Sequence, residues 1–343
     1  MMRLPSYGYL APRTIEEAVA RLAEAPVDTM ILAGGTDLIP NMKRRQQTPA
    51  RVIGLRRVAG LEGVTTAAGC TIGAATTLSS LVHHTDIRAQ YAGLWQAVAQ
   101  IATPHLRNMG TIGGNICLDT RCTYYDQSFE WRKAINFCMK KDGDTCWVAT
   151  SSDRCLAVSS TDSAPALISL GATVSLASAT GTRDVALGDL YANDGMHYLT
   201  RRRDELLTAV HLPDRSGWRS TYWKLRRRGS FDFPVASVAA AARFDGDQIA
   251  ELRLVLGAVA SRPLEVPAAA TRLIGHALTD DLIAGAADDA YALAKPMDNT
   301  DFELVWRKKV VRSLVTSALR ELRGDDVRAT RVSLAKQPLM VVS

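Results

Sequence analysis

Two glycine-rich turns constrain the fold of this chain more than any other feature of its sequence. The first, LAGGTDL at residues 32–38, follows an expected strand at residues 29–33, and the second, GTIGGN, covers residues 110–115. Adjacent glycines let the backbone bend tightly and approach a ligand closely. Their N–H groups, together with the hydroxyl of Thr36, would suit a phosphate oxygen. Neither turn matches GxGxxG or the P-loop pattern, so an ordinary β-turn is the simpler interpretation of either one alone.

The remaining pattern predicts a mixture of helices and strands. Thr14 and Glu17 have the spacing of a capping box, which predicts a helix that begins after Thr14 and ends near residue 25. Apolar periodicity and glycine or proline boundaries predict further elements. The expected helices cover residues 93–102, 165–170 and 302–322, and the expected strands cover 51–55, 172–177, 220–225, 235–244 and 249–259. We therefore divide the chain into regions 1–59, 60–215 and 216–325, followed by a tail at 326–343.

Composition excludes several classes of function. The chain has 343 residues, of which 47% are hydrophobic and 22% charged, which is ordinary for a globular protein. We expect no membrane span, because no run approaches about 18 apolar residues, and a cytoplasmic location, because the N-terminus lacks a secretory h-region. The net charge of +6 is concentrated in short basic runs at 43–45, 201–203 and 226–228. We interpret these as solvated faces or contacts to an anionic cofactor rather than as a nucleic-acid interface.

Five of the six cysteines lie between residues 117 and 155. This segment has few aliphatic residues and balanced charges, so a metal centre would supply cross-links that a hydrophobic core cannot. Four of its cysteines, Cys122, Cys138, Cys146 and Cys155, are spread through it without histidine or a CxxC pair. Four thiolates suit either zinc or an iron–sulfur cluster, and their spacing leaves both open. We interpret Cys117 and Cys70 as small buried hydrophobic residues.

Several motifs in order resemble the FAD-binding subunits of the xanthine oxidase and carbon monoxide dehydrogenase family. They are the two turns, DSAPAL at 162–167, KLRRRGSFDFPVASVAAAAR from residue 224 and LVLGAVASRPLEVPAAATRLIG from residue 254. The resemblance covers about residues 5–324 and implies an α+β fold. Its parts would be a two-part FAD-binding domain of the vanillyl-alcohol-oxidase (PCMH) type, over 1–59 and 60–215, and a smaller C-terminal α+β domain over 216–325. Residues 117–158 would be an inserted iron–sulfur loop.

The resemblance also implies which residues contact FAD. The first turn would wrap the pyrophosphate, the second would form another phosphate loop, and Lys224 would stabilise negative charge at the pyrimidine edge of the flavin. Asp162 matches an acidic position on FAD, although it could instead be a helix N-cap. The full set is Ile31, Leu32, Ala33, Gly34, Gly35, Thr36, Asp37, Ile101, Ala102, Thr111, Gly114, Asn115, Asp162, Leu206, Leu207 and Lys224.

A flavin subunit with an added cysteine loop is similar to one branch of this family, the 4-hydroxybenzoyl-CoA reductases of anaerobic aromatic degradation. That similarity implies a [4Fe–4S] cluster on Cys122, Cys138, Cys146 and Cys155, because a cluster adds an electron input to a flavoprotein while zinc adds only rigidity. Electrons would pass from ferredoxin through the cluster and FAD to the [2Fe–2S] clusters of a small subunit and the molybdenum of a large one. The assembly would be a dimer of heterotrimers, and this chain would hold no catalytic residue.

Two alternatives remain open at this stage. In the first, the cysteines hold a structural zinc and the flavin exchanges electrons with NAD. In the second, the protein is a binding or scaffold protein whose glycine turns bind nothing.

Overall fold

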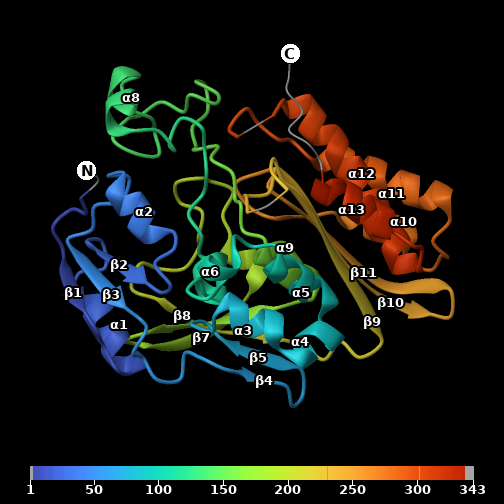
Figure 1. Cartoon of the computed structure of the whole chain (residues 1–343), viewed down its shortest axis with the longest axis horizontal. Coiled ribbons are helices and arrows are strands. Elements are labelled where there is room, and N and C mark those ends of the chain that lie inside the picture. Colours follow the sequence, from blue (N-terminus) through green and yellow to red (C-terminus); the bar gives the residue numbers. More distant parts are fainter. Residues whose placement is uncertain (1–2, 230, 301, 337–343) are drawn as a thin grey trace.

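The computed structural model describes residues 3–229, 231–300 and 302–336. Its elements form three β-sheets with helices packed around them (Figure 1). The cysteine-rich insert, residues 117–158, carries α8 (Phe129–Ala134) and projects above the rest of the molecule in this view. None of the helices in the described part of the chain is long and apolar enough to cross a lipid bilayer.

The N-terminal unit contains a three-stranded parallel sheet. Its order is β1 (Gly8–Leu10), β3 (Arg51–Gly54) and β2 (Thr29–Leu32). Helix α1 (Ile15–Glu24) begins where predicted, because the Thr14 hydroxyl accepts the N–H of Glu17 at 3.1 Å. The short helix α2 (Leu38–Lys43) follows the first glycine turn. This unit therefore presents the turn at the carboxyl end of β2.

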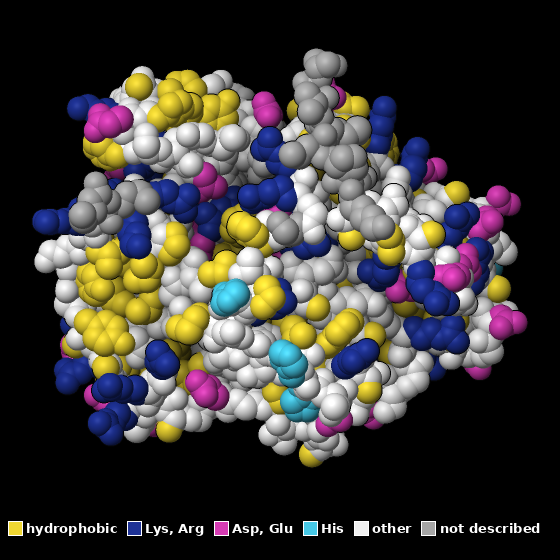
Figure 2. Space-filling view, viewed as in Figure 1, with side chains coloured by type: hydrophobic (Ala, Val, Ile, Leu, Met, Phe, Trp, Pro, Cys, Tyr) yellow, Lys and Arg dark blue, Asp and Glu magenta, His cyan; other side chains and the backbone are white. Residues whose placement is uncertain are grey.

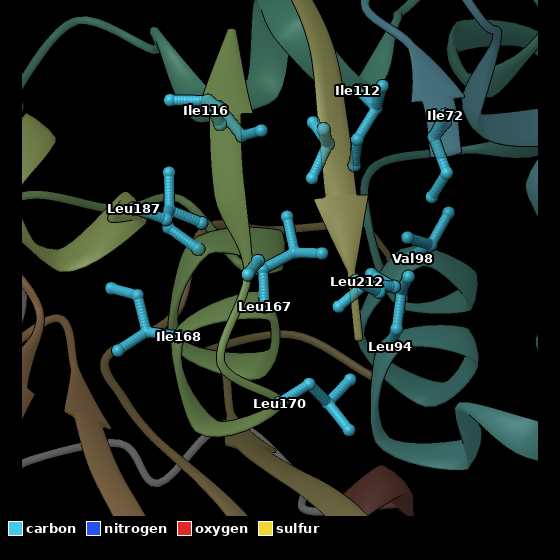
Figure 3. Packing of buried hydrophobic residues seen from close by; sticks show 14 of the residues in the cluster. Ile72, Leu94, Val98, Ile112, Ile116, Leu167, Ile168, Leu170, Leu187 and Leu212 are labelled. Carbon is cyan, nitrogen blue, oxygen red and sulfur yellow. The ribbon is translucent and has the colours of Figure 1, made fainter. Parts of the chain in front are cut away.

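The second unit is built on a five-stranded antiparallel sheet. Its order is β4 (Val64–Thr65), β5 (Cys70–Gly73), β8 (Leu206–Leu212), β6 (Thr173–Ser178) and β7 (Gly181–Ala186). The helices of this unit are α3 (Leu78–His83), α4 (Thr85–Gln90), α5 (Ala92–Ala99), α6 (Pro104–Arg107), α7 (Ile112–Ile116), α9 (Ser163–Ser169) and the 3₁₀ helix η1 (Leu187–Leu190). Figure 3 shows its core, where Leu94 and Val98 of α5 and Leu167 of α9 meet Ile72 and Leu212 of the sheet.

The C-terminal unit contains a four-stranded antiparallel sheet. Its order is β12 (Leu264–Glu265), β11 (Gln248–Gly257), β10 (Ala236–Asp245) and β9 (Trp218–Leu225). Its helices are α10 (Pro267–Leu273), α11 (Asp280–Leu293), α12 (Leu304–Arg323) and α13 (Arg328–Lys336). Helix α12 packs on β9 and β10, as does α5 of the second unit, while α9 packs on β10 and β11. Small side chains at Ala239–Ala242 are fully buried in β10 and allow this close packing.

Two expectations about the chain's organisation need correction. The sequence predicts an extended tail after Gly324, but the tail is helical over Arg328–Lys336, and its last residues lie outside the described range. The insert also has a core of its own, formed by Cys122, Tyr125, Cys138, Cys155 and Ala157. The low aliphatic content of the insert suggested that it has little from which to form a core. Aromatic and thiol side chains, rather than aliphatic ones, form that core.

The insert is fixed to the body at its neck. Arg121 and Val158 exchange backbone hydrogen bonds of 2.8 and 2.7 Å. Asn299 of the C-terminal unit bonds both arms, since its carbonyl accepts the N–H of Thr123 and its amide donates to the carbonyl of Leu156. The segment is thus a docked module and not a free loop.

Candidate functional site

The two glycine-rich turns lie against each other. A Cβ atom built on Gly34 would stand 1.9 Å from the carbonyl oxygen of Met109 and 2.9 Å from Cα of Gly110. Gly35 has φ of +75°, a left-handed conformation that glycine adopts without steric cost. Glycine at both positions therefore permits the close contact between the two turns. The turns begin at residues 32 and 110 of the sequence but form one surface in the fold.

Apolar side chains remain uncovered beside these turns. Ile31 and Leu32 at the end of β2, and Ala33 directly after it, are only half-buried. Leu106 is 40% exposed and Met109 is 45% exposed on the neighbouring segment. Figure 2 shows a band of Lys and Arg side chains across this face, below the insert. An anionic ligand with apolar parts fits such a surface.

The second turn continues into α7 and reaches the start of α9. The Thr111 hydroxyl accepts the N–H of Gly114 at 3.1 Å and so caps α7. The side-chain oxygen of Asn115 accepts from the hydroxyl of Thr161 at 2.9 Å and from the N–H and hydroxyl of Ser163 at 3.1 and 2.6 Å. Asn115 thus supports the N-terminus of α9, a structural role that the motif alone did not reveal.

Asp162 and Lys224 form a buried ion pair at the other end of this surface. The ammonium of Lys224 donates to the Asp162 carboxylate at 2.9 Å and to the carbonyl of Gln100 at 3.2 Å. The hydroxyl of Tyr222 donates to the other carboxylate oxygen at 2.6 Å. Asp162 occupies the N-cap position of α9, but its carboxylate makes no capping hydrogen bond there. Burial raises the pKa of Asp162 and lowers the pKa of Lys224, and the ion pair opposes both shifts.

Of the remaining predicted contacts, Ile101 and Ala102 lie close to this pair. Ile101 and Ala102 directly follow Gln100, whose carbonyl binds Lys224. Ala102 has φ of +48°, and Arg107 holds this unusual turn by donating to the carbonyls of Ile101 and Ala102 at 2.8 and 3.2 Å. Leu206 and Leu207 are buried on β8. Contacts therefore link the first glycine turn, through Gly110, α7 and the start of α9, to Lys224.

The carboxylate of Asp37 is directed towards the insert. It forms a short ion pair with Arg121, which also pairs with Asp126 at 3.4 Å and lies 4.6 Å over the ring of Phe233. Burial opposes the charge of Arg121, but Asp37, Asp126 and Asp119 together raise its pKa. Sequence reasoning missed this link, because partners 84 residues apart leave no local pattern.

The four predicted metal-ligating cysteines line one cavity in the insert. Its other lining residues include Tyr124, Tyr125, Met139, Lys140 and Trp147. All four thiols are buried, and burial raises the pKa of Cys122 to about 12 and that of Cys155 to about 11. Metal binding would displace these protons. Within the described ranges, no three His, Cys, Asp or Glu side chains stand close enough to share a single metal ion.

The other two cysteines lie outside this cavity. Cys70 is buried in the main core, as expected. Cys117 is half-buried and packs against the same core.

Two family models match the chain. The FAD binding domain in molybdopterin dehydrogenase matches residues 5–215, and the CO dehydrogenase flavoprotein C-terminal domain matches residues 220–322. The aldehyde oxidoreductase FAD-binding subunit PaoB of Escherichia coli K12 is 32% identical over 326 residues, which cover 92% of this chain and 99% of that protein. The carbon monoxide dehydrogenase medium chain of Hydrogenophaga pseudoflava is 27% identical over 320 residues, 92% of this chain and 96% of that one.

Solved structures show the same fold. Carbon monoxide dehydrogenase from Hydrogenophaga pseudoflava matches with a TM-score of 0.78 at 26% identity, over 93% of this chain and 98% of that one. The Cu,Mo-CO dehydrogenase in its cyanide-inactivated form also matches with a TM-score of 0.78, at 27% identity over 94% and 99% of the two chains.

Proposed function

This chain belongs to the family of FAD-binding subunits of molybdopterin dehydrogenases, and from that premise we propose that it is an electron-transfer subunit that holds FAD and an iron–sulfur centre. The observation that carries the proposal is the convergence of four cysteines on one cavity in a segment docked to the FAD-binding domain. Bound FAD and the centre would supply the electron-transfer chemistry, while substrate would react on another subunit.

We assign FAD to the surface between Gly34 and Lys224. The abutting glycine turns offer close backbone approach for the pyrophosphate. At the far end, Lys224 would stabilise negative charge on the flavin ring, and Asp162 and Tyr222 fix its ammonium in place. Ile101 and Ala102 would supply apolar contacts beside it, and Leu206 and Leu207 of β8 are proposed as further apolar contacts to FAD. In this proposal FAD is the common ligand of the predicted contact residues, and the role of each residue stays a prediction.

The identity of the sulfur-bound centre is the finer part of the proposal. Each sulfur around a mononuclear zinc stands about 2.3 Å from the ion, which requires the thiolates to crowd together. The four cysteines instead line a shared cavity without any three of them meeting that requirement among the described residues. Four thiolates suit a [4Fe–4S] cluster as well as zinc, and we propose the cluster because it would add an electron input beside the flavin.

We infer the partner subunits of this chain from the proteins to which it is similar. The relatives are described as medium chains or FAD-binding subunits of larger enzymes. We propose that this chain assembles with a large molybdenum-cofactor subunit and a small [2Fe–2S] subunit, in a dimer of heterotrimers. A ferredoxin-type protein would donate or accept electrons at the insert.

Two substrate classes are consistent with this role. The cysteine insert resembles that of the 4-hydroxybenzoyl-CoA reductases, which supports reductive dehydroxylation of 4-hydroxybenzoyl-CoA to benzoyl-CoA. The second candidate is aldehyde oxidation, because the relative with 32% identity is an aldehyde oxidoreductase subunit. Assaying the purified complex separates them. Benzoyl-CoA formation with a low-potential donor supports the first, and aldehyde-dependent reduction of an acceptor supports the second.

The cluster assignment is tested by Cys138→Ser, with Cys117→Ser as the matched control. Cys138 lines the cavity, and Cys117 packs against the main core instead. We expect Cys138→Ser to lose at least half of the bound iron and sulfide while the flavin content stays unchanged, and Cys117→Ser to keep both. Iron and sulfide that survive in Cys138→Ser, or stoichiometric zinc in the unaltered chain, would refute the assignment.

A further inference from the structure

The guanidinium of Arg132 is the least satisfied buried charge in the insert. Arg132 lies on α8, and its side chain is 0% exposed. Its atoms Nε, Nη1 and Nη2 are all buried, and no described residue lies within hydrogen-bonding distance of any of them. Its ion-pair partner Asp142 stands 3.7 Å away and is itself 38% exposed. Five N–H donors are therefore buried with one distant acceptor.

Another cation of the insert, Lys140, has the hydrogen-bond acceptors that Arg132 lacks. Lys140 is also buried, but its ammonium donates to Asp119, Thr120 and the carbonyl of Gly195 at 2.7–2.8 Å. The insert thus provides acceptors where a cation has only a structural task. Moving a charged side chain out of water is unfavourable unless hydrogen bonds and counter-charges compensate for the lost hydration. Arg132 lacks that compensation in the protein chain alone.

Arg132 does not itself line the cysteine cavity, but its contacts lead to the segment around Cys138, which does. Its partner Asp142 closes a tight turn that begins at Cys138, where the carbonyl of Cys138 accepts the N–H groups of Lys141 and Gly143. The ring of Phe137, the residue before Cys138, lies 5.9 Å from the guanidinium carbon. Burial raises the pKa of Tyr125, which lines the cavity, and the charge of Arg132 is among the groups that oppose this rise.

We infer that Arg132 is a positioning residue for the sulfur centre, and that its buried N–H groups donate to the sulfur atoms of the centre held by the four cysteines. This inference rests on the proposed function, since it needs an anionic centre in the cavity. Four thiolates and the bridging sulfides surround such a cluster with negative charge. They would supply both the acceptors and the counter-charge that Arg132 lacks, and the guanidinium would in turn make reduction of the centre easier.

The test compares Arg132→Met with Lys133→Met in the full chain, reconstituted anaerobically with ferrous iron and sulfide. Lys133 is the exposed cation next to Arg132 on the same helix, so it controls for net charge. We expect Arg132→Met to lower the equilibrium constant for reducing the cluster about tenfold, which is about 59 mV for a one-electron couple. Lys133→Met should leave the potential unchanged, and Arg132→Lys should fall between the two.

A second measurement separates this role from a structural one. Without iron, Arg132→Met should melt no lower than the unaltered chain, because it removes a buried charge that has poor partners. An equal loss of melting temperature with and without iron would overturn the inference, and so would an unchanged cluster potential. If Arg132→Met does not fold, Arg132→Gln gives the same comparison. Failure of the unaltered chain to take up iron and sulfide would instead refute the proposed centre, and the inference with it.

Discussion

At the scale of single residues, Gly34 is the point where the two halves of the FAD surface touch. The backbone of Met109 occupies the place where any Cβ on Gly34 would stand. A backbone atom cannot move aside as a flexible side chain can, so a larger residue has to separate the two turns.

We expect Gly34→Ala to weaken FAD binding at least tenfold, because the phosphate-facing turns would no longer meet. Flavin content after gel filtration and a fluorescence titration with FAD measure this effect. Gly188→Ala is the control, since the nearest atom to its Cβ would be the flexible Glu265 carboxylate at 3.5 Å. Wild-type flavin affinity in Gly34→Ala would contradict the assigned site.

The Asp162–Lys224 pair gives a second prediction at this scale. Lys224→Met would leave a buried carboxylate without its cation, which costs about 3–5 kcal/mol of unfolding free energy. The double variant Asp162→Asn/Lys224→Met should recover part of that loss, as urea unfolding would show. A double variant no more stable than Lys224→Met would argue against coupling between the two side chains.

The stability of the single variant Lys224→Met should also depend on pH in a defined direction. Burial already raises the pKa of Asp162 in the folded protein, and loss of Lys224 removes a group that lowers it. A carboxyl with a folded-state pKa above its unfolded value favours the folded state when protonated. The stability deficit of Lys224→Met should therefore be largest at neutral pH and shrink as the pH falls towards the raised pKa. A deficit that grows on acidification would contradict this sign.

Motifs indicated a set of residues for FAD, but not what each side chain contacts in the fold. Asp37 belongs to the first turn, yet its carboxylate pairs with Arg121 of the insert. Asn115 belongs to the second turn, yet its side chain supports α9. The spacing of residues along the sequence predicts local backbone conformation, whereas these side-chain pairings depend on how distant segments pack.

At the scale of elements, Arg121 connects the insert to the first glycine turn. Its guanidinium pairs with Asp37 on one side and Asp126 on the other. Gln46 adds a second connection by donating to the carbonyl of Tyr125 at 2.6 Å. Through these contacts, the conformation of the insert is coupled to the turn that would hold the FAD pyrophosphate.

We expect Arg121→Met to loosen the insert and lower the flavin content together. Hydrogen bonds to charged groups contribute about 1.5–3 kcal/mol each, so opening of the insert should increase by about tenfold or more. The rate of trypsin cleavage within residues 122–157 measures this opening. Arg243→Met, which removes an exposed pair with Glu251, serves as the control. Unchanged cleavage and flavin content in Arg121→Met would disprove the coupling.

Several helices and strands were predictable because their apolar periodicity and end signals agree. The strand over 51–55 and the helix after Thr14 are examples, and the structure confirms both. Helix α13 was not predicted, because its polar sequence carries little periodic signal and it is held by long-range contacts. Arg331 of this helix bonds Glu321 and Thr221 and lies 4.1 Å over Trp223.

At the scale of the whole molecule, the two-part FAD-binding fold with a C-terminal domain was predicted from the order of the motifs and is confirmed by the family and structural matches. The way the insert docks was not predictable, because it depends on three units at once. Gln46 comes from the first, Gly195 from the second and Asn299 from the third. In the proposed function, this arrangement would hold a sulfur centre and a flavin within one subunit.

The most direct test of this account is the absorption and EPR spectrum of the full chain purified without oxygen, with iron, sulfide and zinc measured on the same sample. We predict bound flavin together with about four irons and four sulfides per chain, and a cluster EPR signal after reduction. Flavin without iron, or one zinc per chain in place of iron and sulfide, would contradict the central claim that this subunit couples FAD to a cysteine-bound cluster.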